Sequence, residues 1–518
     1  MSLSMDGVLK ATGCFFLFCW SYSFLKGLQA VNYAAGYRPM FSPITLVGAM
    51  LPMTWWNLGL NWTWKHRKTA YFNQKYDIIS MVPWLHGQPS YYTGSLEVAQ
   101  QLLSNEGRLN KPRKLSSPFL LWGENVFSAN HDDWKRHRRI LAPAFNTKTY
   151  AMVLEQTRNI YRDMVESEGW EGKSAITIDS AAGLTLRTAF LVIVRCGFGM
   201  SLKWVTDDEE NVGDTNVGHA LKVVLDTTIL RLLLPSWMYQ LPIQKLRTID
   251  QTWRSFAKFM RKSVQSRYEE LAGNPQLLDT SDDVFTRLVS AIDGEGKNKL
   301  DMDEVIGNTF VLMFAGHETT AVTLAATLAY LALYPNEQQK AHSEIVSIIS
   351  HRDPTLEDLP KLTHTLACFQ EALRLYPAGQ TLTRETAEDI HVKVSNPSAS
   401  TMVLPKGSLM MIDMIGIHRN PRAFPVPDEF RPSRWYGISD PDVTMFGIGP
   451  RACIGRKFSQ TEALTFLSLF LREWKVEPAL QNGETFAQYE ERVMSKAGHV
   501  GLSFGITKPI GLVLKRRA

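Results

Sequence analysis

Residues 446–455 read Phe-Gly-Ile-Gly-Pro-Arg-Ala-Cys-Ile-Gly, and the stretch from Arg456 to Trp474 that follows them has helical spacing. The glycines allow a tight turn with positive φ and let the backbone approach a large flat ligand. A helix that begins at Arg456 would direct backbone N–H groups and the positive end of its dipole toward the sulfur of Cys453. Both effects favour a thiolate over a thiol. The alternative interpretation is a core cysteine in a glycine-rich turn.

This loop resembles the haem-binding loop of the cytochrome P-450 family, Phe-x-x-Gly-x-Arg-x-Cys-x-Gly. The matching positions are Phe446, Gly449, Arg451, Cys453 and Gly455. The resemblance implies that Cys453 is the axial ligand of the iron of haem b. It also implies that Arg451 pairs with a haem propionate and that Phe446 packs beside the sulfur. Five matched positions favour the haem site over the core cysteine.

A second motif is Glu371-Ala-Leu-Arg374, within a predicted helix at 362–376. Residues three apart lie on one face of a helix, a spacing that an exposed ion pair would also have. In the family this pair is completed by an arginine further on, which the resemblance places at Arg434 and, as the weaker choice, at Arg431. The implied role is structural, because the buried charge network holds the cysteine loop in place.

A third motif, Ala315-Gly-His-Glu-Thr-Thr320, interrupts an apolar stretch that predicts a helix from 303 to 334. A helix that is apolar on all sides is buried, and a polar centre suits a core helix that crosses a polar cavity. The resemblance implies that Thr319 holds water beside bound dioxygen, that Glu318 relays protons and that Gly316 leaves room for dioxygen. The alternative is a polar break in which the Thr319 hydroxyl bonds to a carbonyl one turn back.

A fourth motif, Trp134-Lys-Arg-His-Arg138, resembles the family's Trp-x-x-x-Arg, which implies that both side chains reach a haem propionate. Arg384 resembles another propionate ligand of the family. We expect the remaining cations near these motifs to form a basic face on the cysteine side of the haem, suited to an acidic electron-donor protein. They are Lys135, Arg136, Arg139, Arg456 and Lys457. An ordinary solvated helix face is the alternative.

Residues 1–68 predict a membrane anchor and an interfacial segment. The apolar stretch 7–28 approaches the roughly 20 helical residues that span a bilayer core, and a cleaved signal peptide is its alternative. A second apolar stretch, 44–64, contains Pro52 and two asparagines and is the weaker candidate for a span. The basic cluster 65–68 predicts a cytosolic body by the positive-inside rule. Resemblance to microsomal members of the family implies the endoplasmic reticulum membrane, although their proline-rich hinge is missing here.

Composition narrows the possible classes. The 518 residues are 45% apolar, and a net charge of +5 without a Lys/Arg block gives no support to nucleic-acid binding. Five scattered cysteines without a CxxC pair make a poor disulfide framework and a poor zinc site. Residues 69–518 contain no repeat or linker, so we expect one catalytic domain. Helical patterns outweigh strands, which are expected late, as at 390–394 and 408–414. These patterns predict a mainly α fold (α-rich α+β), and the resemblance implies the cytochrome P-450 fold.

The resemblance implies a haem-thiolate monooxygenase that inserts one oxygen atom of O2 into a C–H bond of a lipophilic molecule, such as a terpenoid or a sterol. Electrons would come from NADPH through the flavins of a reductase, with cytochrome b5 as a second candidate donor. The candidate pocket positions are Phe310, Phe314, His317, Gln380, Thr381 and Val500. The alternatives are a reductase-independent isomerase or dehydratase, a haem carrier or sensor, and a membrane transporter. The acid beside Thr319 argues against the isomerase.

Overall fold

The computed structural model describes residues 5–71, 73, 75–200, 202–205, 211–212, 215–277, 283–439 and 442–517. Helices make up 54% of the chain and strands 12%, which confirms the mainly α fold. The chain divides into two compact units. The first comprises Met1–Pro112, Gln380–Glu429 and Ile448–Arg451, and the second Arg113–Gly379, Phe430–Gly447 and Ala452–Ala518. The boundary expected at residue 68 falls inside the first unit. A single catalytic domain over 69–518 stays a prediction.

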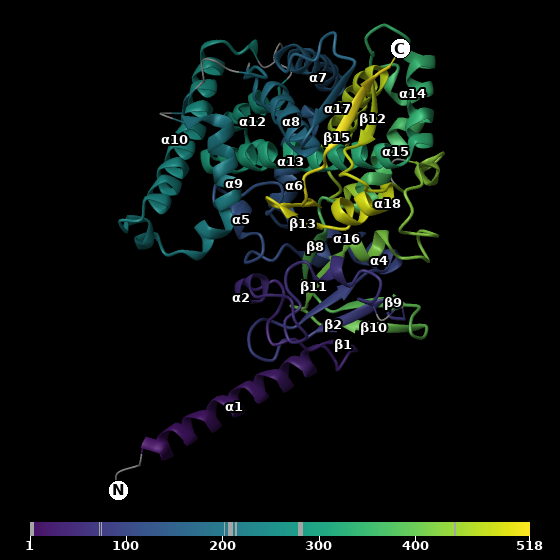
Figure 1. The fold of residues 1–518 in the computed structure, drawn as a ribbon. Helices are drawn as coiled ribbons and strands as arrows, with labels where there is room; N and C mark the ends of the chain where they lie inside the picture. The colour runs from purple at the N-terminus through teal and green to yellow at the C-terminus, as the bar shows by residue number, and fades with distance from the viewer. Residues whose placement is uncertain are drawn as a thin grey trace. The chain divides into compact units, whose positions relative to one another are not determined.

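The first unit is built on a six-stranded sheet in the order β1-β2-β3-β11-β8-β4 (Figure 1). β11 pairs parallel to β3 and antiparallel to β8, so that early and late strands share one sheet. The expectation that strands cluster late was therefore wrong. The early strands have two to four residues each, too few for a periodic pattern. The elements are α1 (Met5–Ala30), β1 (Gly36–Tyr37), α2 (Leu46–Met50), α3 (Trp62–Lys65), β2 (Ile78–Met81), β3 (Ser90–Thr93), α4 (Leu96–Leu103), β4 (Leu109–Asn110), β8 (Thr381–Thr386), β9 (Ile390–Val394), β10 (Ser400–Leu404), β11 (Leu409–Asp413) and α16 (Met414–His418).

The N-terminal apolar stretches have different structures. The first forms α1, whose side chains from 13 to 23 are exposed and whose last turns pack on the core of the first unit through Phe24 and Leu28. The second is not one helix, because the short helices α2 and α3 are separated by a loop. The buried side-chain amide of Asn57 donates to three carbonyl oxygens in and after α2, at 3.1–3.2 Å. Asn57, which makes residues 44–64 a weaker candidate for a membrane span, therefore holds the turn that follows α2.

The centre of the second unit is α13 (Met302–Leu333), which agrees within one residue with the helix predicted at 303–334. A capping box of Asp301 and Glu304 begins it. It packs against α8 (Ala181–Phe198), α15 (Thr363–Leu375) and α17 (Arg456–Glu473), among others. Among the described residues of the second unit, α8 and α13 are long and apolar enough to cross a membrane, but 67% and 78% of their most apolar stretches are buried. Both are therefore core helices of this unit.

The remaining elements of the second unit surround these helices (Figure 1). β12, β15 and β5 form a three-stranded sheet, and β13 and β14 form a hairpin. The helices predicted at 336–350, 362–376 and 456–474 correspond to α14, α15 and α17. The other bounds are α5 (Ser117–Leu120), α6 (His131–Leu141), α7 (Thr147–Ser167), β5 (Ala175–Ile178), β6 (Asn211–Val212), β7 (Thr215–Asn216), α9 (Val217–Leu233), α10 (Gln244–Gly273), α12 (Val284–Ser290), α14 (Pro335–Ile349), β12 (Trp474–Pro478), α18 (Phe486–Tyr489), β13 (Ala497–Val500), β14 (Ser503–Ile506) and β15 (Leu512–Arg516).

Candidate functional site

The cysteine loop is closed by a backbone hydrogen bond from Cys453 N to Phe446 O, 2.8 Å long. Gly447 and Gly449 have φ of +88° and +76°, a region in which other residues are strained. A Cβ on Gly449 would also lie 2.1 Å from the carbonyl oxygen of Leu103. The loop therefore requires glycine at position 449 for both its backbone conformation and its packing.

The sulfur of Cys453 is held close to positive charge. Burial raises the pKa of its thiol, while the backbone N–H of Gly455 and the guanidinium groups of Arg456 and Arg138 lower it, and the balance stays on the raised side. The helix start therefore does not by itself make a thiolate, contrary to the simplest reading of the sequence. A metal cation on the sulfur would supply the missing stabilisation, because coordination deprotonates a thiol outright. Residues near Cys453 thus fit a metal-bound sulfur.

Helix α6 carries the tryptophan–arginine motif. Trp134 is buried, and Nη1 of Arg138 donates to the carbonyl oxygen of Ala452 at 3.2 Å, next to Cys453. Burial lowers the pKa of Arg138 and the nearby Cys453 opposes that shift. These contacts, all within the second unit, place Arg138 of the motif beside the sulfur of Cys453.

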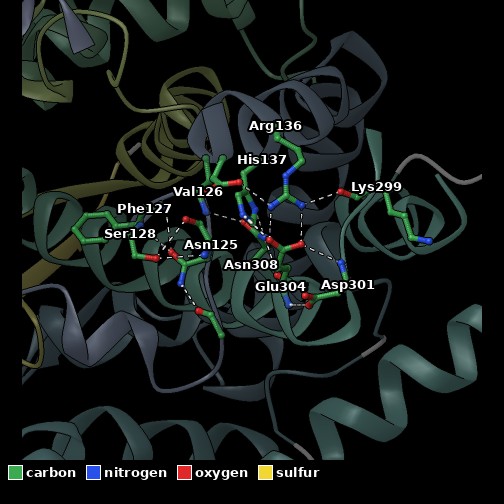
Figure 2. A network of polar contacts seen from close by, with 12 residues as sticks. Asn125, Val126, Phe127, Ser128, Arg136, His137, Lys299, Asp301, Glu304 and Asn308 are labelled. Carbon is green, nitrogen blue, oxygen red and sulfur yellow. Dashed lines mark hydrogen bonds and ion pairs between the residues drawn. The ribbon is translucent and has the colours of Figure 1, made fainter. Parts of the chain in front are cut away.

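The middle of α6 is fixed to α13 by a polar network, shown in Figure 2. Both guanidinium ends of Arg136 donate to the carboxylate of Glu304, at 2.5 and 2.8 Å. The Nδ1 atom of His137 accepts from the Asn308 amide at 2.8 Å, and Asn308 Oδ1 accepts from Val126 N at 2.9 Å. Burial lowers the pKa of His137 to about 4, so its ring is neutral. The network ties the motif-bearing helix to the central helix.

The network corrects the basic face expected from the sequence. Arg136 cannot belong to it, because its guanidinium is bound to Glu304 and also contacts Asp133. Lys135 pairs with the exposed Asp132 at 2.9 Å, which partly cancels its charge. Of the five cations, Arg139 and Lys457 are exposed and form no ion pair within the part of the chain that the structure describes. The guanidinium carbon of Arg456 lies 5.4 Å from the ring centroid of Phe446.

Three basic side chains of the first unit, Lys111, Arg384 and Arg451, form what we call the cationic cluster. All three side chains are buried, and Arg451 forms an ion pair with Glu106. Burial lowers the pKa of Arg384 to about 10, and Arg451 lowers it further while Glu106 opposes the shift. Nε of Arg384 is buried without a hydrogen-bond partner among the described residues. This excess of buried positive charge fits an anionic group such as a haem propionate.

Lys111 is a member of the cluster that the sequence motifs did not indicate. Burial lowers its pKa well below the usual value, and Arg384 and Arg451 lower it further. Lys111 lies just beyond the two-residue strand β4, and nothing in its local sequence distinguishes it from a surface lysine. Its burial among arginines more than 250 residues later in the chain is a property of the tertiary structure alone.

Glu371 of α15 is the centre of a buried polar network in the second unit. Its oxygens accept from Arg374 Nε at 2.8 Å and Nη2 at 2.9 Å, and from Arg434 Nε at 3.1 Å. Arg431 contributes its backbone N–H at 2.9 Å, and Arg434 is the arginine whose guanidinium contacts Glu371 at 3.1 Å. The indole of Trp435, which the motif did not indicate, donates at 2.9 Å. Glu371 and Arg374 are both 0% exposed.

The polar centre of α13 has one open face. Ala315 is exposed and Leu312 and Thr319 are half-buried, on a helix otherwise buried from 304 to 332 apart from Gly316. Positions i, i+3 and i+7 share a helix face, so these three lie together. The hydroxyl of Thr319 donates to the carbonyl oxygen of Ala315 at 2.8 Å, the bond that the alternative interpretation predicted. Its lone pairs remain available on this open face.

Glu318, beside Thr319, is 5% exposed. Its Oε2 accepts from the Leu502 backbone N–H at 3.1 Å and from the Ser503 hydroxyl at 2.7 Å. Burial raises its pKa to about 7, although these hydrogen bonds oppose the shift. A carboxyl group with a pKa near neutrality can both take up and release a proton at physiological pH.

Gly316 packs closely against α8. A Cβ at this position would lie 2.6 Å from Cδ1 of Ile193 in α8. The glycine therefore permits the close approach of α8 and α13. That it also leaves room for dioxygen stays a prediction.

The candidate pocket residues separate into distinct environments. Phe310 is 0% exposed and stacks on Trp122 at 5.3 Å, and the buried His317 packs on Phe190 of α8, so their role as pocket lining stays a prediction. Phe314 contacts Phe119 at 5.5 Å. The half-buried Val500 belongs to the second unit, and the half-buried Gln380 and Thr381 to the first. Ala315, which we did not predict, is exposed at the centre of α13.

Comparison with known proteins gives consistent results. The family model described as Cytochrome P-450 matches residues 44–500. The chain is 32% identical over 468 residues to cytochrome P-450 monooxygenase 124 of Postia placenta, covering 88% of each chain. It is 28% identical over 389 residues to cyclooctat-9-en-7-ol 5-monooxygenase of Streptomyces melanosporofaciens, covering 74% of this chain and 79% of that one. The crystal structure of the cytochrome P450DA heme domain matches with a TM-score of 0.72 at 20% identity, covering 93% of this chain and 99% of that one. The last match confirms the predicted fold.

Proposed function

The chain belongs to the cytochrome P-450 family and is a monooxygenase of that family, and we propose that it hydroxylates a lipophilic small molecule with electrons from an NADPH-dependent reductase. The observation that carries this proposal is the setting of Cys453. A lone sulfur at the start of α17, in a loop closed onto Phe446 and flanked by guanidinium groups, can bind one metal ion from one side. The protein ligand of a haem-thiolate enzyme has this form.

The residues of the second unit fit haem b. Cys453 would supply its sulfur ligand, and Arg138 with Trp134 would offer donors to a propionate. The cationic cluster of the first unit, with Arg384 Nε unbonded among the described residues, offers buried positive charge to an anionic group such as a propionate. Haem supplies the activation of dioxygen and the oxidation of the C–H bond, so that the protein's own work is binding, orientation and proton movement.

Proton delivery is assigned to the open face of α13. The Thr319 hydroxyl already donates to Ala315 O, so its lone pairs are left to accept a hydrogen bond from water. Glu318 holds a proton with a pKa of about 7 and can pass it toward that water. Thr319 would therefore position the proton and Glu318 would replenish it.

An acidic electron-donor protein would use the positive charge near the cysteine loop. The face is smaller than the sequence predicted, because Arg136 and Lys135 have acidic neighbours. Arg139, Arg456 and Lys457 remain, and such charges act mainly on association rate and orientation. The donor we propose is an NADPH-dependent reductase that carries flavins, with cytochrome b5 as a second candidate.

Membrane association is assigned to α1 and to the loop after α2. Phe15, Phe18 and Tyr22 of α1 are each more than 60% exposed, which favours a lipid environment. Trp55, between α2 and α3, is 94% exposed and would lie at an interface, where tryptophan is enriched. We propose an anchor in the endoplasmic reticulum membrane formed by α1 alone, with the catalytic body in the cytosol and the second stretch in contact with the surface.

The substrate class is proposed from the open face of α13 and from one relative. Apolar residues with few polar groups border Ala315 along α13, which suits a lipophilic ligand. The Streptomyces relative is, by its name, a 5-monooxygenase of cyclooctat-9-en-7-ol. We therefore place terpenoids first and sterols second as substrates of this chain.

The test of the proposal is the ligand of the iron. Cys453→Ser should abolish the red-shifted Soret band of the ferrous–CO complex, because that band requires a thiolate. Cys19→Ser, on the exposed surface of α1, is the matched control and should keep it. If Cys453→Ser keeps the band, another residue ligates the iron. Product formed from a terpenoid substrate without NADPH and reductase would instead identify the isomerase alternative.

A further inference from the structure

The carboxylate of Glu318 has a structural partner that proton delivery does not require. It lies against the turn of the β13–β14 hairpin, where Val500 pairs with Ser503 across a two-residue turn. Its Oε2 accepts both the Leu502 backbone N–H and the Ser503 hydroxyl. The Ser503 side chain is 2% exposed, so water does not compete for this hydroxyl. We call this group of contacts the clasp.

Gly501 shows how closely the turn approaches the carboxylate. Its φ is +63°, and a Cβ built on it would lie 1.7 Å from Oε1 of Glu318. The carboxylate therefore occupies the space where a side chain at position 501 would be. One oxygen of Glu318 bonds the turn and the other packs on it, so the turn and α13 fit together only with glycine at this position.

The hairpin lies along α13 beside the open face. One helical turn after Glu318, a Cβ at Gly505 would lie 3.1 Å from Cβ of Val322, so β14 follows the helix closely. The turn itself is accessible, since Gly501 is exposed and Val500 and Leu502 are half-buried. Glu318 is the immediate neighbour of Thr319, so the turn ends next to the residue assigned to proton delivery.

An isolated two-stranded hairpin is marginal in water. Within the second unit, a backbone hydrogen bond from Phe504 N to Ala378 O, 2.9 Å long, also holds β14. That bond holds the strand but not the turn. The clasp is the contact that fixes the turn, and it does so through two hydrogen bonds to a single charged or neutral acid.

We propose that the clasp sets the position of the Val500–Leu502 turn and thereby determines which bulky ligands fit beside Thr319. Ser503 and Gly501 are then positioning residues for ligand selection, and Glu318 has a second role besides moving protons. This inference rests on the proposed function, because it places the bound ligand over the open face of α13.

The test uses the full-length haem-loaded protein in detergent and needs no known substrate. The ferric protein is titrated with imidazole, which is small, and with clotrimazole, which is bulky, and the spectral shift gives a Kd for each. Ser503→Ala removes one donor of the clasp, and Gly501→Ala displaces the carboxylate. Gly483→Ala is the matched control, because Gly483 has φ +76° but no atom within 4 Å of a built Cβ. Glu318→Gln keeps an acceptor oxygen for both donors.

We expect Ser503→Ala and Gly501→Ala to weaken clotrimazole binding by about tenfold while imidazole binding changes by less than about twofold, since one hydrogen bond of this kind is worth roughly a factor of ten. Gly483→Ala and Glu318→Gln should retain both Kd values. Clotrimazole Kd values that stay at the wild-type level in both clasp variants would overturn the inference. The inference would also be overturned if Glu318→Gln weakened clotrimazole binding as much as Ser503→Ala does. A wild-type protein that gives no azole shift and no ferrous–CO band would instead contradict the proposed function.

Discussion

Two glutamates on neighbouring core helices differ in the number and the charge of their hydrogen-bond partners. Glu371 of α15 is 0% exposed and Glu318 of α13 is 5% exposed. Glu371 accepts from two guanidinium groups, one backbone N–H and an indole. Glu318 accepts from one backbone N–H and one hydroxyl, both neutral. Of these two buried carboxylates in the second unit, Glu371 therefore has positively charged partners and Glu318 has neutral ones.

The difference shows how one side chain can serve structure or chemistry. Ion pairs and charged hydrogen bonds stabilise the anion of Glu371, which suits a permanent structural role. Around Glu318 the neutral donors do not offset burial, so its pKa rises to about 7 and its proton can move at physiological pH. The partners of a buried acid therefore indicate its role better than its burial does.

The largest expected loss of stability comes from removing Glu371, the buried acid that is paired with two guanidinium groups. Glu371→Ala leaves Arg374 buried beside Arg434 with no carboxylate between them, and breaking a buried pair costs about 3–5 kcal/mol. A loss of this size is comparable with the whole stability of many domains. We expect a protein with little bound haem and a strongly lowered unfolding midpoint, measured from haem content and urea titration.

The control for this experiment is a surface pair. Lys135→Ala removes the partner of Asp132, and both side chains are at least 60% exposed. Its effect should stay below about 1 kcal/mol, because surface salt bridges contribute little. Equal losses in the two variants would mean that burial of the Glu371 pair is unimportant, and the comparison would fail.

The next effect depends on pH. The folded-state pKa of Glu318 lies above the usual 4.5, so the folded protein binds the extra proton between these two values. Stability should therefore fall as pH rises from 4.5 to 7 and level off above, by about 3 kcal/mol for a shift of this size. Asp226 of α9 contributes to the raised pKa.

Glu318→Gln removes this titration. The difference in free energy of unfolding between wild type and variant should change across pH 4.5–7 and be constant above pH 8, because other groups cancel in the difference. Urea titrations at five pH values measure it. A difference that does not vary with pH would show that Glu318 is compensated like Glu371.

A third acid sharpens the comparison further. Glu462 of α17 is 0% exposed, and neither carboxyl oxygen has a hydrogen-bond partner among the described residues. Burial raises its pKa well above the usual value. Glu462→Met should raise the free energy of unfolding by about 1–2 kcal/mol, since it removes a buried polar group that lacks a partner. If urea titrations show instead that Glu462→Met lowers the free energy of unfolding by the same amount, Glu462 has a hydrogen-bond partner outside the described residues.

The smallest effect on stability is expected at Thr319. Within the described part of the chain its hydroxyl bonds to the carbonyl oxygen one turn back, so Thr319→Ala should change the free energy of unfolding by less than about 1 kcal/mol. Its effect on catalysis should be large, because the proton would no longer be positioned. NADPH oxidation should continue while product falls and hydrogen peroxide rises. An unchanged ratio of product formed to NADPH oxidised would show that Thr319 has no role in proton delivery and is a core residue of α13.

The sequence predicted the elements that depend on nearby residues. The bounds of α13 follow from a continuous apolar run and an acid-capped start, and those of α17 from the glycine at its N-cap. The early strands β1 to β4 were missed, since two to four residues carry no period. The loop after α2 was read as part of a possible span, because hydropathy does not show that Asn57 folds back on three carbonyl groups.

What the sequence alone determined is the chemistry of the residues and the local geometry of each motif: a cysteine before a helix, an acid beside an alcohol, a glutamate three residues before an arginine. The tertiary structure decided which distant groups those residues meet. It placed Ser503 on Glu318, 185 residues earlier, Lys111 among the arginines of the cationic cluster, and Gly316 against α8. The physical reason is that hydrogen bonds and charge compensation act over a few ångströms. Only the packing of the whole chain brings residues so far apart in sequence within that range.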